Sequence, residues 1–199
     1  DPATGEIPPG IKRRELAYAQ TLPNDTKNKK GSGYNWTAMG PYNVGGRTRA
    51  LAIDVTNENV LLAGGISGGL WRSANSGANW DKVTAPDQHH SITCIVQDTR
   101  IGEKNVWYYG SGEAYGNSAD YLGNGMYKSI DGGLTWDTLS STVSGTPQTP
   151  DIWDRIWNVA IDPFNPTEDV VLAATNGKIQ RSTDGGNTWT TVLGVSGVL

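Results

Sequence analysis

Two segments of the sequence combine carboxylates with aromatic rings, residue types that suit the binding of sugars and peptides. They are residues 112–124 and 140–154. Aromatic rings stack on the apolar faces of sugars and carboxylates accept hydrogen bonds from hydroxyls, and function concentrates in loops held by a rigid scaffold. With two nearby arginines, the candidate residues for a glycan or protein ligand are Arg47, Glu113, Tyr115, Asp120, Trp153, Asp154 and Arg155. The alternative is that Tyr115, Tyr121 and Trp153 only cover strand edges.

Other side chains with binding or redox chemistry are less specific. Arg47 follows two glycines and either binds an anion or pairs with a structural Asp. His89 and His90 could ligate a metal, but adjacent loop histidines are more often solvated, so we predict no metal and no cofactor. Cys94, the single cysteine, lies in the apolar run 92–96, which predicts a buried thiol. One cysteine excludes both an intrachain disulfide framework and a cysteine-based zinc site.

These candidates depend on a scaffold that an internal repeat reveals. Three segments of the form Ser-x-Asp-x-Gly-x-Thr-Trp align at spacings of about 50 residues. Glycine supplies positive φ, and the Asp side chain accepts backbone N–H groups across a hairpin turn, so we expect these carboxylates to be structural. The first copy is degenerate, with an amide in place of the acid. The turn residues are Ser73, Asn75 and Trp80, then Ser129, Asp131 and Trp136, then Ser182, Asp184 and Trp189.

Strand-like runs precede and follow each repeated turn. The first run of each repeat ends in Asp, as in residues 49–54, 91–98 and 156–162. Four short antiparallel strands per repeat is typical of an all-β propeller blade. We therefore predict an irregular N-terminal leader over residues 1–33, then a partial β-propeller over 34–199 with blades at about 34–84, 85–140 and 150–195. A propeller usually closes with at least four blades, so we expect a fragment of a larger one.

Charge and hydropathy exclude several partners. The net charge of −4 provides no basic field for nucleic acid and no attraction to anionic membranes. No apolar run approaches the ~18–20 residues that span a bilayer. The sequence starts at Asp1 without a basic and apolar leader, so we expect any signal peptide to have been removed or to lie outside this chain. We predict neither nucleic-acid binding nor membrane insertion.

The repeated turns resemble the Asp-box of the bacterial neuraminidase repeat superfamily. That superfamily includes sialidases, xyloglucan-active glycoside hydrolases, sortilin-type receptors and a plant photosystem assembly factor. The resemblance implies a propeller with the boxes on the face away from the ligand. A second resemblance, carried by residues 36–54 and 63–73 and by the leader 4–17, is to large secreted propeller proteins of the Bacteroidetes type. It implies an extracellular or cell-surface protein exported by the type IX route, with secretion or surface machinery as a partner.

Catalysis is the point on which these resemblances diverge. The arginine motif of sialidases is absent, and nothing in the spacing of Arg47, Arg49 and Arg155 marks a triad. The xyloglucan-active enzymes resemble the first blade more closely, but they carry an Asp where this chain has Ile66 or Ser67. Ordinary glycoside hydrolysis needs two carboxylates. Our main interpretation is therefore a binding or scaffold propeller exported as type IX cargo, and the alternative is a glycoside hydrolase, sialidase-like or xyloglucanase-like, whose catalytic residues the sequence does not identify.

Overall fold

The computed structural model describes residues 46–113, 121–143 and 151–194, and four helical positions nearer the N-terminus, Arg14, Ala17, Tyr18 and Thr21. The chain divides into two compact units, Asp1–Gly45 and Gly46–Leu199. The strands described below all lie in the second unit. Within the described part of the chain, no helix has the length and apolarity to cross a membrane.

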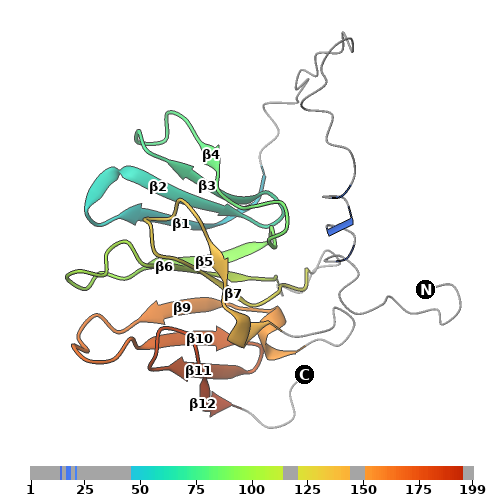
Figure 1. The fold of residues 1–199 in the computed structure, drawn as a ribbon, viewed down its shortest axis with the longest axis vertical. Coiled ribbons are helices and arrows are strands. Elements are labelled where there is room, and N and C mark those ends of the chain that lie inside the picture. Colours follow the sequence, from blue (N-terminus) through green and yellow to red (C-terminus); the bar gives the residue numbers. More distant parts are fainter. Residues whose placement is uncertain are drawn as a thin grey trace, which may run out of the picture. The chain divides into compact units, whose positions relative to one another are not determined.

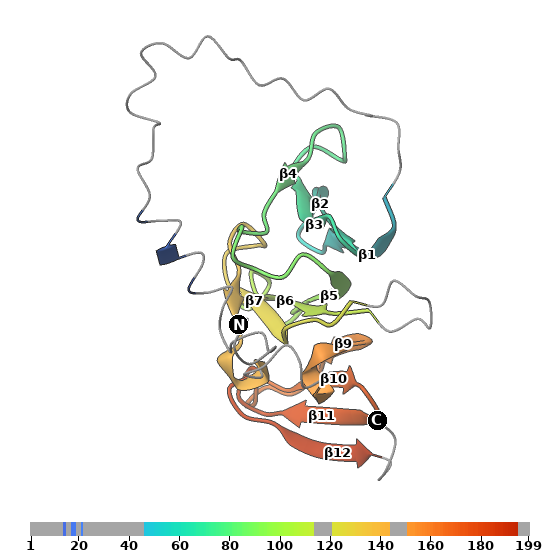
Figure 2. The ribbon, with the colours of Figure 1, turned by 90° about the vertical axis from the view of Figure 1, so that its right-hand side faces the viewer.

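Three four-stranded antiparallel sheets follow one another along the chain (Figure 1). In each sheet the strands pair in sequence order, as an up-and-down meander, and Figure 2 shows the same succession from the side. This is the predicted architecture, three blades of a β-propeller. Blade 1 comprises β1 (Thr48–Asp54), β2 (Asn57–Gly65), β3 (Gly69–Ser73) and β4 (Asp81–Lys82); blade 2 comprises β5 (Ile92–Gln97), β6 (Trp107–Ser111), β7 (Met126–Ser129) and β8 (Asp137–Thr138); blade 3 comprises β9 (Asn158–Ile161), β10 (Val171–Thr175), β11 (Lys178–Ser182) and β12 (Thr190–Gly194).

The hydrophobic core lies between the blades. Successive side chains of a strand point to opposite faces, so the second strand of blade 2 contributes to two separate clusters. Trp107 and Tyr109 pack against blade 1, whereas Tyr108 packs toward blade 3. A blade with both faces covered therefore needs apolar residues at successive positions, which explains the continuous apolar run of β6.

A glycine on the second strand brings each blade close to the next one. A Cβ built on Gly64 would lie 2.4 Å from Cγ2 of Ile92 in blade 2. The same contact recurs at Gly110, where a Cβ would lie 2.5 Å from Cγ2 of Ile156, directly before blade 3. The branched side chain of one blade thus fills the space left by a missing side chain on the blade before it.

The repeated turns connect the third and fourth strands, and we call them the repeat turns. In blade 2, Oδ1 of Asp131 accepts hydrogen bonds from Ser129 Oγ (2.7 Å) and from the N–H groups of Leu134 and Thr135 (both 3.0 Å). The Trp136 indole donates to the carbonyl of Gly133 at 3.2 Å. Burial acts to raise the pKa of Asp131, but the hydrogen bonds, led by that of the Thr135 hydroxyl, lower it overall.

Blades 1 and 3 contain the same turn, but they differ in the side chain that accepts the hydrogen bonds and in the residue at the position with positive φ. In blade 3, the Thr188 hydroxyl and the other donors lower the pKa of Asp184 to about 2. In blade 1, Asn75 Oδ1 still accepts from the N–H of Asn79 at 2.8 Å. Ser76 there has a φ of 58°, the left-handed region that favours glycine, at the position that Gly132 and Gly185 fill in the other blades.

Candidate functional site

The two ends of the blades carry different kinds of connection. At one end, which we call the turn face, each repeat turn donates a backbone N–H to a carbonyl of the neighbouring hairpin in its own blade. Ser76 donates to the Asn59 carbonyl (2.9 Å), Gly132 to that of Asn105 (3.0 Å) and Gly185 to that of Asp169 (2.9 Å). At the other end, the loop face, the longer connections bind one another. Gly69 N–H donates to His90 (2.9 Å) and Gly123 N–H to Asp154 (2.6 Å).

Two of the predicted ligand residues, Arg47 and Glu113, meet at the loop face. Arg47 lies directly before β1 of blade 1, and Glu113 follows β6 of blade 2. The Arg47 guanidinium Nη2 donates to Oε2 of Glu113 in a close ion pair. The Glu113 side chain is completely buried, whereas the Arg47 side chain is 44% exposed. Pairing was one of the two alternatives for Arg47, but the partner is a glutamate of the next blade rather than an aspartate.

Glu113 has a further feature that the sequence did not indicate. Its main chain is held by a hydrogen bond from its N–H to the carbonyl of Tyr121 (2.6 Å). Its second carboxylate oxygen, Oε1, is buried and has no hydrogen-bond partner among the described residues. A buried carboxylate oxygen costs free energy unless a donor satisfies it. The position is therefore suited to a hydrogen-bond donor.

Trp153 and Asp154 lie in the short helix η3 (Ile152–Asp154), and both are buried. The Asp151 side chain accepts the N–H of Trp153 (2.7 Å), and Asp154 Oδ2 accepts the N–H of Asp151 (2.8 Å), which forms a capping box. Burial raises the pKa of Asp154, while the Asp151 N–H opposes the shift. The Trp153 ring packs edge-on against Trp189 with centroids 5.0 Å apart. Both side chains thus stabilise the loop face, and Arg155 beside them is half-buried.

Gly112 brings the Glu113 and Asp154 segments together. Its φ is +90°, and a Cβ at this position would lie 1.9 Å from the Asp154 carbonyl oxygen. A side chain at position 112 would force the two segments apart. Of the remaining predicted ligand residues, Tyr115 and Asp120 lie outside the described residues, and Tyr121 at the end of the same loop is 47% exposed.

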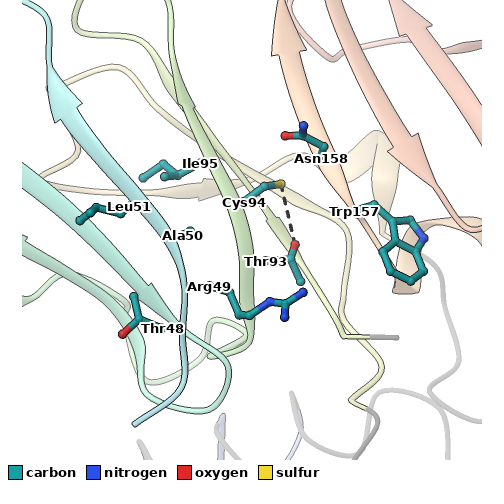
Figure 3. Close-up of a pocket in the computed structure, with 9 residues that line it drawn as sticks. All are labelled: Thr48, Arg49, Ala50, Leu51, Thr93, Cys94, Ile95, Trp157 and Asn158. Carbon is teal, nitrogen blue, oxygen red and sulfur yellow. Dashed lines mark hydrogen bonds between the residues drawn. The ribbon is translucent and has the colours of Figure 1, made fainter. Parts of the chain in front are cut away.

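A groove of about 490 Å³ runs between the innermost strands β1, β5 and β9 (Figure 3). Its lining includes Arg49, Thr93 and Trp157. These three residues occupy the same position of the repeat, since each lies five residues before the Asp that ends its run, Asp54, Asp98 or Asp162. Thr93 Oγ1 lies 2.6 Å from the Ile156 carbonyl oxygen, so it also links blades 2 and 3. Sequence reasoning did not select this set, although alignment of the first strands would have placed the three side chains in register.

Cys94 is the buried thiol that the sequence predicts, whereas His89 and His90 are half-buried rather than fully solvated. Cys94 lines the same groove but is buried, which raises the pKa of its thiol to about 11. The thiolate nucleophile is therefore scarce at neutral pH. Within the described ranges, no group of three or more His, Cys, Asp and Glu residues is placed to hold a metal ion.

Comparison with known proteins relates this chain to xyloglucan-degrading enzymes. No family model matches the sequence. The xyloglucanase Xgh74A of Acetivibrio thermocellus is 30% identical in an alignment of 172 positions that covers 73% of this chain and 20% of that protein. The chain thus spans about a fifth of the length of this relative.

Solved structures support the fold. An ancestral GH74 enzyme superposes with a TM-score of 0.58 at 23% identity, covering 74% of this chain and 18% of that one. The GH74 enzyme of Niastella koreensis gives a TM-score of 0.52 at 24% identity, covering 73% of this chain and 22% of that one. The three blades are therefore a fragment of a larger propeller.

Proposed function

We propose that this chain is part of a polysaccharide-active β-propeller of the xyloglucanase kind, with a glycan as the ligand of its loop face. The observation that carries the proposal is the 30% identity to a xyloglucanase across 73% of the chain. A likeness over 73% of the chain is longer than any single blade, so it involves connections as well as strands. This favours the glycoside hydrolase-like interpretation over a scaffold without a glycan ligand.

The Arg47–Glu113 pair is the part of the loop face best suited to hold a glycan. Glu113 orients the guanidinium, and the half-exposed Arg47 presents further N–H donors of its fixed planar group. Such donors suit hydroxyl or ring oxygens of a sugar, and an oriented arginine loses less rotamer entropy on binding. Tyr121, at 47% exposure, offers a ring face for stacking.

Ordinary glycoside hydrolysis needs two carboxylates that flank the scissile bond, and the described residues of the loop face do not supply such a pair. Neither Ile66 nor Ser67, the two residues where the resemblance calls for an acid, carries a carboxylate. Ile66 is 4% exposed and its N–H donates to the carbonyl of Arg47 (3.1 Å), whereas Ser67 is exposed. Glu113 is committed to Arg47, and Asp154 is committed to a capping box. We therefore assign Arg47 and Glu113 to binding and positioning of the glycan rather than to proton transfer.

The test is whether the full-length protein binds and cleaves xyloglucan. Affinity electrophoresis measures binding, and the release of reducing ends measures turnover. We expect Arg47→Ala to weaken binding about tenfold, the loss of one charge-assisted hydrogen bond of ~1.4 kcal/mol. Glu113→Gln should have a smaller effect in the same direction. Glu58→Gln, an exposed glutamate on the turn face, is the matched control and should leave binding unchanged. The proposal is refuted if the protein neither binds nor cleaves xyloglucan or any glycan of a wider panel.

A second candidate is a propeller that binds its ligand without cleaving it, exported to the medium or cell surface by the type IX route. The observation that favours it is the absence of a carboxylate at both Ile66 and Ser67, the two residues where the resemblance calls for an acid. The two candidates separate in one assay, because saturable binding without released reducing ends supports the second alone. Fractionation of cells and medium tests export, and a cytoplasmic pool as the main form of the protein would contradict it.

A further inference from the structure

The innermost strands of blades 1 and 2 are irregular at the end nearest the loop face. The pairing of β1 with β2 shifts register around Arg49, and that of β5 with β6 shifts around Thr93. A register shift of this kind is a β-bulge, which leaves one residue outside the ladder and redirects its side chain. Trp157, the equivalent residue of blade 3, lies directly before β9. All three side chains line the groove between β1, β5 and β9.

These side chains bring complementary chemistry to the groove. In Figure 3 the Arg49 side chain extends from β1 across the groove toward Thr93, and Trp157 lies on the blade 3 side. Thr93 Oγ1 donates its hydrogen to the Ile156 carbonyl (2.6 Å), so toward a ligand the hydroxyl oxygen acts as an acceptor. Arg49 and Trp157 are half-buried, so the protein holds part of each side chain and solvent reaches the rest.

Arg49 sets the charge of the groove. Among the described residues that line it, Arg49 alone is charged, in a chain whose net charge is −4. The carboxylates that end the innermost runs, Asp54, Asp98 and Asp162, lie at the opposite, turn-face end of those strands. A guanidinium has five N–H donors, so Arg49 can keep a contact within the protein and still bind both oxygens of a carboxylate. The groove is therefore suited to an anion.

The rest of the lining favours an anion that is carried on a ring. The Trp157 indole offers a face on which the apolar side of a sugar ring can pack. Asn158 Oδ1 accepts the N–H of Val159 (2.9 Å), which leaves the amide nitrogen as a donor for hydroxyl oxygens. The volume of about 490 Å³ lies within the ~300–1,000 Å³ typical of small-ligand sites. A bare inorganic anion would use neither the indole nor this volume.

We propose that the groove binds a sugar acid, a hexuronate unit of the glycan that contacts the loop face. Its carboxylate pairs with Arg49, its ring packs on Trp157, and one of its hydroxyls donates to Thr93. Thr48 lines the groove and directly follows Arg47, so one glycan can contact both places. The choice of a sugar as carrier of the carboxylate rests on the proposed function, whereas the preference for an anion rests on the charge of the groove.

Isothermal titration calorimetry of the full-length protein tests this proposal. The probes are short oligosaccharides of galacturonate and of glucuronate, each compared with the neutral form obtained by reduction of its carboxyl groups. We expect an acidic oligosaccharide to bind about 10–100-fold more tightly than its neutral form, the contribution of a charge-assisted pair. Arg49→Ala should abolish this preference. Arg49→Lys should keep only part of it, because an ammonium does not bind two carboxylate oxygens in a fixed planar geometry.

Two further positions complete the set of variants. Trp157→Ala should weaken binding of the acidic oligosaccharide about fivefold, and Trp157→Phe should weaken it less, because phenylalanine keeps a ring. Arg181→Ala is the matched control, since it removes the same charge from the third strand of blade 3, outside the groove. This control should bind every probe as the wild type does.

Three results would overturn the proposal. The first is equal affinity for the acidic and neutral oligosaccharides, which would refute the sugar acid and leave the proposed function standing. The second is competition by sulfate as strong as that by the hexuronates, together with no effect of Trp157→Ala, which would make the groove a site for simple anions. The third is an acidic preference that Arg49→Ala does not change, which would place the site elsewhere. A failure of the proposed function differs from all three, because no glycan would then bind at all.

Discussion

Gly64→Ala is a direct test of how the blades fit together. The new Cβ would lie 2.4 Å from Cγ2 and 2.7 Å from Cβ of Ile92. Carbon atoms pack best at about 3.5–4.0 Å, so the overlap exceeds 1 Å. Ile92 is completely buried and branched at Cβ, so its side chain cannot rotate away without meeting other core atoms. Relief requires the two blades to separate locally.

Two opposing effects set the magnitude. Overpacking of a dense core costs about 1–3 kcal/mol. Replacement of glycine by alanine also restricts the unfolded chain, which stabilises by about 0.4–1 kcal/mol where the backbone permits it. The steric cost is larger, so we expect a net destabilisation of about 1–2 kcal/mol. For a domain of this size, each kcal/mol lowers the melting temperature by about 2–4 °C.

Thermal unfolding followed by circular dichroism measures the effect, with Gly65→Ala as the matched control. A Cβ on Gly65 would have its closest contact at 3.4 Å, an ordinary distance, so this variant should be neutral or slightly stabilised. Ile92→Ala alone removes core atoms and should cost about 2–5 kcal/mol. The Gly64→Ala/Ile92→Ala double variant should lose less than the sum of the two. Equal melting temperatures for Gly64→Ala and Gly65→Ala, or strict additivity, would refute the reasoning.

Four further outcomes are expected. The pKa of Asp184 is depressed from its ordinary 3.8 to about 2, so its contribution is present above about pH 4 and is lost as pH falls toward 2; the stability difference between wild type and Asp184→Asn, followed by chemical denaturation, should shrink over that interval. Ser76→Gly should raise the free energy of unfolding by about 1 kcal/mol, measured in the same way, because it relieves a φ of 58°. Arg100 forms an ion pair with Asp98 at 2.6 Å, and the Asp98 side chain is only 2% exposed; Arg100→Ala should therefore cost about 3–5 kcal/mol in urea unfolding, because it leaves this carboxylate buried without its cation, and Arg100→Lys should recover only part of the loss. Cys94 should resist Ellman's reagent in the native protein and react after denaturation, because burial raises its pKa to about 11.

The sequence predicted the blades because their determinants are local and repeated. The turn residues, including Ser129 and Asp131, form the hydrogen bonds expected within eight consecutive residues. In each repeat, the first strand-like run was predicted to end in Asp, and these runs correspond to β1, β5 and β9. The first ends with its strand at Asp54, and the other two end one residue beyond their strands, at Asp98 and Asp162. Strand alternation then fixes which side chains face the neighbouring blade.

The loop face was less predictable because its contacts join residues distant in sequence. Arg47 and Glu113 were each selected as ligand residues, but nothing in either local sequence indicated that they pair. Asp154 was selected for its charge, whereas its position in a capping box with Asp151 depends on backbone geometry. The close approach of Gly112 to that segment is likewise a tertiary effect.

The repeats themselves separate residues that hold the fold from residues that can distinguish one ligand from another. Positions with the same role in every blade have similar side chains, as the turn serines and the basic residues before them show. Arg49, Thr93 and Trp157 occupy one repeat position and line one groove, yet they share neither charge nor size. Packing within a blade cannot require three such different side chains at equivalent places. Because that groove is bordered by all three blades, its chemistry is set by the differences between the repeats. A ligand that extends from Arg47 toward the innermost strands would therefore meet a cation, a hydroxyl and an aromatic ring.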